Sequence, residues 1–420
     1  MNLVHELRIG EHKPQPRPIP QADAATTTHR GKSIALFGLF GCGNFGNDAS
    51  LEAMISSLRE SLPDARLSCI CKDPGVISGS FGIEAVQLRG EEPAGTGPGR
   101  LLRKLVREVR DLVHAVRHMR KTDILVVPGT GILDDFGVRP TSLPLDVFNW
   151  CLAARLVGTR IAFVSIGAGP IGNRFSRWLM ASAARMARYR SYRDTGSRDF
   201  LKNEGVDTSR DVIYPDLAFK LPVPPSLETV SRTQLIVGVG VMNYRGWYAF
   251  QEQGQAIFDD YILKMTEFVA LLLAGGHGVR LLTGDKDDVP AVEAIVATLG
   301  DTHVGSLTYE PVHSIHDVIR QATCTDLVIA TRFHNVVAAL MAGKPVISLG
   351  YAPKNALLLA EMGLGDYCQN VEDFDVGLLA EQFARLADNR EEHARTIRSK
   401  VAKFRQSLWV QDKFLLSTIL

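Results

Sequence analysis

The sequence lacks long apolar runs, a disulfide framework and a surplus of charge. None of its 420 residues lie in an apolar run near the roughly 18 residues that a membrane-spanning helix needs, and residues 1–30 contain no apolar segment typical of a signal peptide. Six cysteines in a chain of this length exclude a disulfide scaffold. Forty-seven basic and 46 acidic side chains leave a net charge of +1, so nucleic acid is not an implied partner. These features predict a reduced, cytoplasmic protein.

What the chain does contain is an alternation of short apolar runs with longer amphipathic stretches, from Lys32 to about Leu386. Strands separated by helices in this way are typical of βαβ units and a mostly parallel sheet. A Pro-rich break follows Leu221 and separates two such series. We therefore predict two Rossmann-like α/β domains, at 31–222 and 230–390. A poorly ordered, Pro-rich tail is expected at 1–30 and a helical segment at 391–420.

A glycine-rich loop at 38–48 follows the first predicted strand. In parallel sheets ligands bind at the carboxyl ends of strands, so we expect Asn44 and Asp48 to face a ligand. The stretch 41–46 also matches the dinucleotide-binding Gly-x-Gly-x-x-Gly pattern. That pattern begins late after the strand, and Asp73 is farther along than usual, which weakens this interpretation. A tight turn before a helix capped by Asp48 is the alternative.

Later strand ends carry further glycines and charged residues. Gly131 lies in a Gly-Thr-Gly loop directly after a predicted strand. Arg193 is expected where a strand ends, either to bind an anion or to pair with Asp194. Asp216 is expected near the interdomain cleft as an acceptor for a hydroxyl group, with a turn role as the alternative.

The most informative segment is 326–349, where a buried strand leads directly into a small-residue helix. It places Arg332 and His334 at a helix N-terminus, which is already favourable for anions. Arginine offers a bidentate fork to carboxylate or phosphate, and histidine can transfer a proton near neutral pH. A satisfied core histidine is the alternative. Lys354 follows the next strand and is expected to face the same cleft, or else solvent.

Other features of the sequence are weaker. The pairs Cys69/Cys71 and His313/His316 lack further ligands, so no metal site is predicted. Asp288 is expected to cap a helix. The stretch 100–121 carries eight basic and two acidic residues on an amphipathic pattern. It is expected to be either a solvated helix face or a contact with an anionic membrane surface.

Taken together, these loops resemble the polysaccharide pyruvyl transferase family from about Ile34 to about Leu364. The Arg-x-His motif is the most specific part of the resemblance. One departure is that the family's Asn-x-Gly-Asp-Glu loop reads Asn-Phe-Gly-Asn-Asp here, with an amide at Asn47. The resemblance rests on the segments 41–48, 129–131, 167–170, 193–197, 215–216 and 332–334 and on Lys354.

The resemblance implies a GT-B-like arrangement of the two domains around an interdomain cleft. It also implies transfer of the enolpyruvyl unit of phosphoenolpyruvate to a sugar of a cell-surface polysaccharide or its precursor, with release of phosphate and without a cofactor or metal. The expected catalytic residues are His334 and Arg332, and the expected donor-binding residues are Arg193, Lys354 and Asn335. The expected acceptor-binding residues are Gly41, Asn44, Asp48, Gly131 and Asp216.

Two alternatives to this function remain open. One is a nucleotide-sugar glycosyltransferase of the same fold, and the other is a catalytically silent sugar-binding relative, which the amide at Asn47 would favour. The expected cluster of arginine, histidine and lysine side chains favours a compact anionic donor. The expected partners are therefore phosphoenolpyruvate and a sugar or lipid-linked oligosaccharide, with peripheral contact to the inner membrane face and no nucleic acid.

Overall fold

The computed structural model describes residues 31–90, 100–134, 138–225, 234–246, 253–300 and 305–419. The tail expected at 1–30 lies outside these ranges. The described residues from Lys32 onward belong to one compact unit. Within them, no helix combines the length and the apolar character needed to cross a membrane.

The N-terminal domain is built on a parallel sheet of seven strands in the order β3-β2-β1-β4-β5-β6-β7. The central strands are buried along most of their length because helices cover both faces. The strands are β1 (Ser33–Phe37), β2 (Arg66–Cys71), β3 (Glu84–Gln87), β4 (Ile124–Pro128), β5 (Arg160–Ile166), β6 (Tyr189–Tyr192) and β7 (Val212–Ile213). The helices are α1 (Phe45–Ser61), α2 (Pro74–Phe81), α3 (Arg100–Met119), α4 (Leu143–Val157), α5 (Arg174–Met186), α6 (Thr195–Asn203) and the short η1 (Leu217–Lys220).

The C-terminal domain repeats this architecture with six parallel strands in the order β10-β9-β8-β11-β12-β13. The strands are β8 (Ile236–Gly240), β9 (Gly278–Leu282), β10 (Leu307–Tyr309), β11 (Leu327–Ala330), β12 (Val346–Gly350) and β13 (Cys368–Asn370). The helices are α7 (Gly254–Ala274), η2 (Lys286–Asp288), α8 (Val289–Leu299), α9 (Ile315–Thr323), α10 (Phe333–Met341), α11 (Pro353–Met362), α12 (Val376–Asp388) and α13 (Arg390–Thr418). The prediction of two parallel-sheet α/β domains is confirmed.

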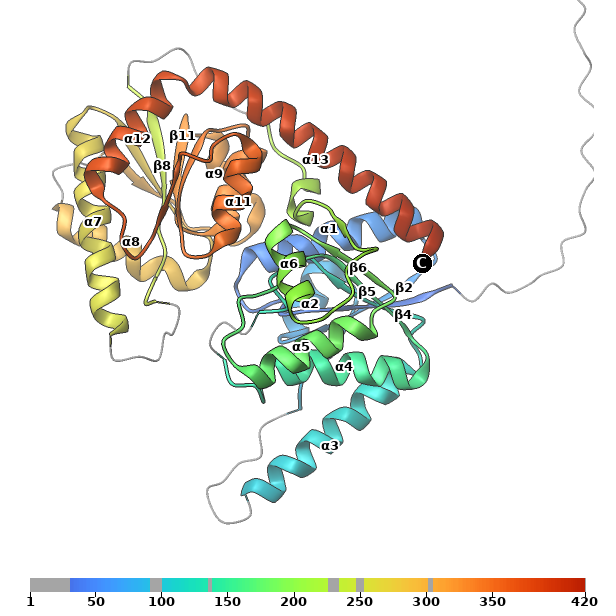
Figure 1. Ribbon diagram of the computed structural model, residues 1–420. Helices are drawn as coiled ribbons and strands as arrows, with labels where there is room; N and C mark the ends of the chain where they lie inside the picture. The colour runs from blue at the N-terminus through green and yellow to red at the C-terminus, as the bar shows by residue number, and fades with distance from the viewer. Residues whose placement is uncertain are drawn as a thin grey trace, which may run out of the picture. The chain divides into compact units, whose positions relative to one another are not determined.

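The last helix, α13, packs on both domains (Figure 1). In its C-terminal half, the Phe404 ring lies edge-on to Phe219, with ring centroids 5.1 Å apart. Gln411 accepts a hydrogen bond from the Ser165 hydroxyl (3.1 Å) and donates one to Ser191 Oγ (2.8 Å). The helix expected at 391–420 therefore joins the C-terminal domain to the sheet of the N-terminal domain.

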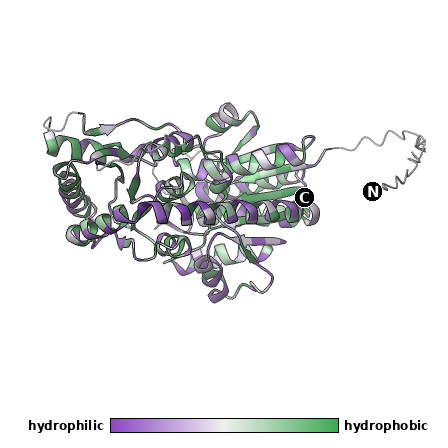
Figure 2. Ribbon diagram, turned by 90° about the horizontal axis from the view of Figure 1, so that it is seen from above, coloured by the Kyte–Doolittle hydropathy of each residue, from purple (hydrophilic) through white to green (hydrophobic). Residues whose placement is uncertain are grey.

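Two hydrophobic clusters stabilise the molecule. The larger one runs through both domains and includes residues of α1, α10 and α13. The smaller one lies on the face of the N-terminal sheet that α3, α4 and α5 cover. Figure 2 shows hydrophobic colour along the strands and mixed colour along the helices. This is the expected pattern for sheets covered by amphipathic helices.

Candidate active site

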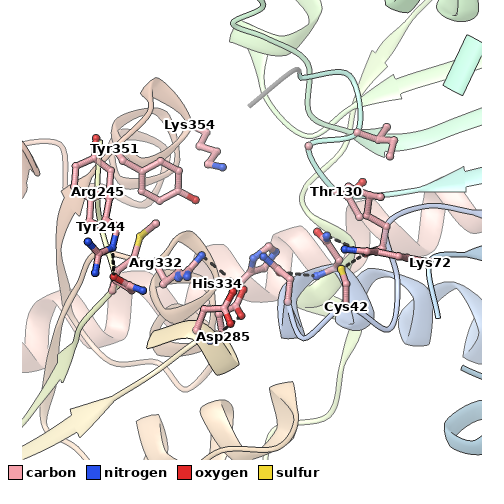
Figure 3. A pocket seen from close by; sticks show the side chains of 18 of the residues that line it. Cys42, Lys72, Thr130, Tyr244, Arg245, Asp285, Arg332, His334, Tyr351 and Lys354 are labelled. Atoms are coloured by element: carbon pink, nitrogen blue, oxygen red, sulfur yellow. Dashed lines mark hydrogen bonds and ion pairs between the residues drawn. The ribbon is translucent and has the colours of Figure 1, made fainter. Parts of the chain in front are cut away.

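A cavity of about 570 Å³ lies between the carboxyl ends of the two sheets (Figure 3). Loops after β1, β2, β4 and β6 line it from the N-terminal domain, and loops after β8, β9, β11 and β12 line it from the other. Its described lining is rich in cations and includes Lys72, Arg193, Arg245, Arg332 and Lys354, together with the acids Asp285 and Asp287. Both the position and the charge are suited to a small anionic ligand.

His334 lies where the two domains meet. It follows β11 in the first turn of α10, and its imidazole packs against the backbone of Gly46 in α1. A Cβ atom built on Gly46 would lie 1.9 Å from His334 Nδ1. Only glycine at position 46 therefore leaves room for the ring between α1 and α10.

The other imidazole nitrogen faces a carboxylate of the N-terminal domain. His334 Nε2 lies 3.9 Å from Asp216 Oδ2 and makes no hydrogen bond within the part of the chain that the structure describes. Burial lowers the pKa of His334 to about 4. Asp216 raises this pKa, whereas Arg193, Lys354 and Arg332 lower it further. The imidazole is therefore neutral at pH 7 in this state.

Arg332 is already held by a carboxylate. Its Nε donates to Asp288 Oδ2 (2.9 Å) and its Nη2 to Asp288 Oδ1 (2.6 Å), while Nη1 lies 3.8 Å from Asp285 Oδ2. Asp288 is fully buried and also accepts hydrogen bonds from the backbone N–H groups of Asn243 and Gly284. Asp288 occupies the N-cap position of α8 as predicted, but its side chain makes no capping bond and binds Arg332 instead. The Nε–Nη2 edge of Arg332 is likewise unavailable for a bidentate contact with a ligand.

Two expected donor-binding cations share one aromatic ring. The guanidinium of Arg193 lies 4.8 Å from the centre of the Phe333 ring, and Lys354 Nζ lies 5.4 Å from it. Arg193 Nη1 also donates to Asp216 Oδ2 at 3.2 Å. Both cations line the cavity, and the ring stabilises their charge through cation–π contact.

Asn335 does not line the cavity. Its side chain is buried between the glycines that follow β8 and β9, since Cβ atoms built on Gly240 and Gly284 would lie 2.8 Å and 2.4 Å from its amide atoms. The expectation that Asn335 contacts the donor is therefore not supported by its position. Helical periodicity explains this, because neighbouring residues on α10 point about 100° apart.

The expected acceptor residues lie in three different places. Asn44 and Gly131 line the main cavity, and the Asn44 side chain also caps α1 by accepting from the Asn47 N–H at 3.2 Å. Asp216 lies beneath the lining, behind His334. Gly41 and Asp48 line a separate cavity of about 490 Å³, and Asp48 accepts a hydrogen bond from the Gly41 N–H. These two residues are therefore not brought together with His334.

The unusual amide at position 47 has a structural partner. Asn47 lines the main cavity, and its side-chain N–H donates to the Leu39 carbonyl oxygen at 3.2 Å. A carboxylate at this position could not make that bond, because it only accepts. The amide therefore stabilises the glycine loop that carries Asn44.

Several lining residues were not predicted. Lys72 follows β2 and Arg245 follows β8, so their positions at strand ends were the available signal. Tyr351 lies beside Lys354, whose Nζ is 4.7 Å from the ring centre. Burial alone raises the pKa of Tyr351, but Lys354 and Arg332 lower it below its usual value. The cavity therefore stabilises negative charge on an oxygen.

The weaker sequence features have ordinary places in the fold. His316 Nε2 lies 2.7 Å from Glu52 Oε1, which links α9 to α1 across the two domains. Cys69 and Cys71 are buried in the hydrophobic core. Among the described residues, no cluster of three or more histidine, cysteine or acidic side chains is suited to a metal ion.

Comparison with known families decides the assignment. The sequence profile of the family Polysaccharide pyruvyl transferase matches residues 44–353. The chain belongs to the polysaccharide pyruvyl transferase family. Within the chain, the match begins at Asn44, in the loop that leads to Gly46, and ends at Pro353, directly before Lys354. No curated protein matches the chain in a sequence comparison.

The structural neighbours of this chain have the GT-B fold. A UDP-GlcNAc 2-epimerase from Neisseria meningitidis bound to UDP-GlcNAc has a TM-score of 0.56 at 12% identity, covering 92% of this chain and 100% of the other. The lipopolysaccharide outer core galactosyltransferase WaaB has a TM-score of 0.53 at 14% identity, with coverages of 91% and 98%. A glycosyltransferase from Rickettsia africae has a TM-score of 0.57 at 12% identity, with coverages of 93% and 100%. At these identities the likeness extends to the fold alone.

Proposed function

We propose that the protein transfers the enolpyruvyl unit of phosphoenolpyruvate to a sugar of a cell-surface polysaccharide or its precursor, forming a pyruvate ketal and releasing phosphate. The family assignment supports pyruvyl transfer in general. The observation that carries the finer proposal is a cation-lined cavity with an imidazole at the interdomain seam. No cofactor or metal takes part in the proposed scheme.

The donor bears a carboxylate and a phosphate, so it needs compensating positive charge. Lys72, Arg193, Arg245 and Lys354 supply this charge around the cavity. The N-terminus of α10 adds a favourable dipole and unpaired backbone N–H groups. Arg332 contributes less to this charge, because Asp288 binds two of its nitrogens and offsets its charge.

His334 would move the proton. A bound anionic donor offsets the nearby cations and so raises the pKa of the imidazole from its low value in the unliganded site. With Asp216 stabilising the imidazolium, His334 would protonate the methylene carbon of the enol while a sugar hydroxyl adds to the central carbon. A second hydroxyl would then displace phosphate from that carbon and close the ketal. One of the two hydroxyl protons leaves with the released phosphate. The other returns to the imidazole and restores the imidazolium.

The acceptor would bind from the side of the N-terminal domain. Asn44, Asn47 and Thr130 line the cavity there and offer amide and hydroxyl groups. Thr130 Oγ1 is buried and has no hydrogen-bond partner among the described residues, so a sugar hydroxyl could satisfy it.

The direct test is phosphate release from phosphoenolpyruvate with a panel of sugar acceptors. His334→Gln is expected to lower turnover by about 10²–10⁴-fold, the usual contribution of a positioned acid or base. His114→Gln, which changes an exposed histidine on α3, is the control and should leave turnover unchanged. Turnover near wild type in a folded His334→Gln variant would refute the assigned role.

A nucleotide-sugar glycosyltransferase is the second candidate function, because a galactosyltransferase is among the structural neighbours. Thermal unfolding with phosphoenolpyruvate, UDP-sugars and GDP-sugars separates the two. Stabilisation by phosphoenolpyruvate is expected because the cavity is cationic. Stabilisation by a nucleotide sugar alone would reverse the ranking. A wild-type protein that binds sugars but releases no phosphate would instead be a silent relative.

A further inference from the structure

We propose that α3 docks this protein on the surface of an anionic phospholipid bilayer. The contact would use a stripe of exposed aliphatic side chains and a row of arginines along its edge. This inference concerns a surface outside the active site and does not depend on the donor chemistry.

The apolar stripe consists of Leu102, Val106, Val109 and Val113. Their exposed fractions are 66%, 59%, 58% and 42%. The spacing of four, three and four residues places all four side chains on one face of the helix. The stripe is not needed by the core, because α3 packs on the protein through the opposite side, where Ala115 and Met119 join the smaller hydrophobic cluster. Figure 1 shows the N-terminal half of α3 extending away from the neighbouring helices.

The arginine row consists of Arg103, Arg110 and Arg117, which are all exposed. Successive members are seven residues apart, so they follow one another along a single edge of the apolar stripe. An exposed apolar face bordered by arginine is typical of helices that lie in the plane of a membrane interface.

The acidic side chains of α3 point away from this face. Glu108 and Asp111 are largely covered and lie near cations of the protein itself: Arg107 Nη2 donates to Glu108 Oε1 at 3.1 Å, and Arg89 Nη1 lies 4.0 Å from the same oxygen. Asp111 accepts a hydrogen bond from the backbone N–H of Gly90. Asp111 Oδ1 also lies 4.0 Å from Arg110 Nε, at the edge of the arginine row. With three exposed arginines beside this one partly covered carboxylate, the exposed face of α3 presents an excess of positive charge, which is complementary to anionic lipid headgroups.

A second apolar feature lies in the same helix layer. Phe175 and Trp178 at the start of α5 are 52% and 54% exposed and stack with ring centroids 5.8 Å apart. The helices α3, α4 and α5 pack on the same hydrophobic cluster and so cover the same face of the sheet. Exposed aromatic rings beside a basic side chain, here Arg174, favour the water–lipid interface.

The competing occupant is a second copy of this chain, because the same spacing fits a coiled-coil seam. Charge argues against it. An antiparallel pair of α3 helices would set the two arginine rows against each other, and a parallel pair would set them against the apolar edge that contains Leu112. A lipid surface supplies the negative charge that a second copy lacks.

The test is co-sedimentation of the full chain with vesicles, without any substrate. Vesicles of phosphatidylcholine with roughly one-third phosphatidylglycerol should bind the protein, and binding should fall with added salt. Pure phosphatidylcholine vesicles should bind it far more weakly. Equal binding to both, or binding to neither, would overturn the proposal.

Point variants locate the contact. Leu102→Asp is expected to lower binding at least tenfold, whereas Leu263→Asp on α7, at a side chain that is 67% exposed, is the matched control and should have no effect. Arg110→Gln should weaken binding about fivefold, and Arg395→Gln on α13 should not. Because all four side chains are exposed, thermal unfolding should be unchanged in each variant. Wild-type binding by Leu102→Asp would overturn the proposal, and so would self-association that depends on Leu102 without vesicle binding. Neither result affects the phosphate-release test.

Discussion

At the scale of single residues, the contact between the two domains at His334 depends on Gly46, which has no side chain. Gly46 allows the imidazole of His334 to lie directly on the first turn of α1. Any larger residue would have to push the ring away or separate the two domains. Substitution at position 46 is therefore expected to disturb the site, although Gly46 itself has no reactive side chain.

The substitution Gly46→Ala tests this contact. The new Cβ would lie 1.9 Å from His334 Nδ1, so we expect phosphate release to fall at least about 100-fold, the size of a lost acid or base. Gly79→Ala in the exposed part of α2 is the matched control, because a Cβ there meets nothing within 4 Å. It should leave activity unchanged. Equal activity of the two variants would contradict the role of Gly46.

The buried imidazole also makes stability depend on pH. The pKa of His334 is about 4 in the folded protein, against 6.5 for an unperturbed histidine. Between these values the unfolded chain binds a proton that the folded protein does not, so the free energy of unfolding falls as pH decreases from about 6.5 to about 4. His334 should account for about 3 kcal/mol of that fall. Urea unfolding of wild type and His334→Gln across this range measures it, and a constant difference between the two would contradict the prediction.

The pairing of Asp288 with Arg332 predicts a large stability effect. Asp288→Ala would leave a mostly buried guanidinium without its principal partner, at a cost of about 3–5 kcal/mol in the free energy of unfolding. Asp287→Ala, which alters an exposed carboxylate one residue away, should change it by no more than about 0.5 kcal/mol. Urea unfolding distinguishes them. Similar values would mean that Asp288 does not hold Arg332 in place.

The sequence predicts which residues lie in this site, but not which of them form ion pairs with one another. Arg332, His334, Arg193 and Lys354 were expected at strand ends, and the fold places all four around one cavity. The Asp288–Arg332 pair joins residues 44 positions apart. Nothing in the spacing of the sequence specifies which carboxylate of the acidic loop turns inward, so this pairing required the structure.

At the scale of secondary structure, α13 is the element that joins the domains. Its buried Gln411 makes hydrogen bonds with Ser165 and Ser191, at the ends of two different strands. The amide thus satisfies polar groups that would otherwise be buried alone.

Gln411→Ala is expected to lower the free energy of unfolding by about 1–3 kcal/mol, because it leaves both serine hydroxyls without this partner. Gln406→Ala, one and a half turns earlier and exposed, is the control and should be nearly neutral. Chemical unfolding measures both. A neutral result for Gln411→Ala would mean that water replaces the amide at this contact.

The sequence identifies the central strands more clearly than the short peripheral ones. The central strands, such as β1, β5 and β11, are continuous apolar runs because both of their faces are buried. By contrast, β3, β10 and β13 have three or four residues and only partial burial, so their sequences carry no clear periodicity. The apolar positions of α13 likewise do not identify the domain on which this helix packs.

At the scale of the whole molecule, the two domains share one hydrophobic cluster that includes α1, α10 and α13. We therefore expect calorimetry to show a single unfolding transition rather than two. Phe404→Ala, which removes the ring that lies against Phe219, should lower the midpoint without splitting the transition. Two resolved transitions in the wild-type protein would show that the domains unfold independently.

The 3.9 Å separation between His334 and Asp216 joins the two domains, because each group belongs to a different one. A hinge motion that opened the cavity to exchange substrates would lengthen that separation and lower the pKa of the imidazole. If His334 acts as proposed, its imidazole would carry the proton only when the two domains are closed around the substrates. In an open form phosphoenolpyruvate would not be protonated, so its hydrolysis by water would be slow without a separate lid over the cavity.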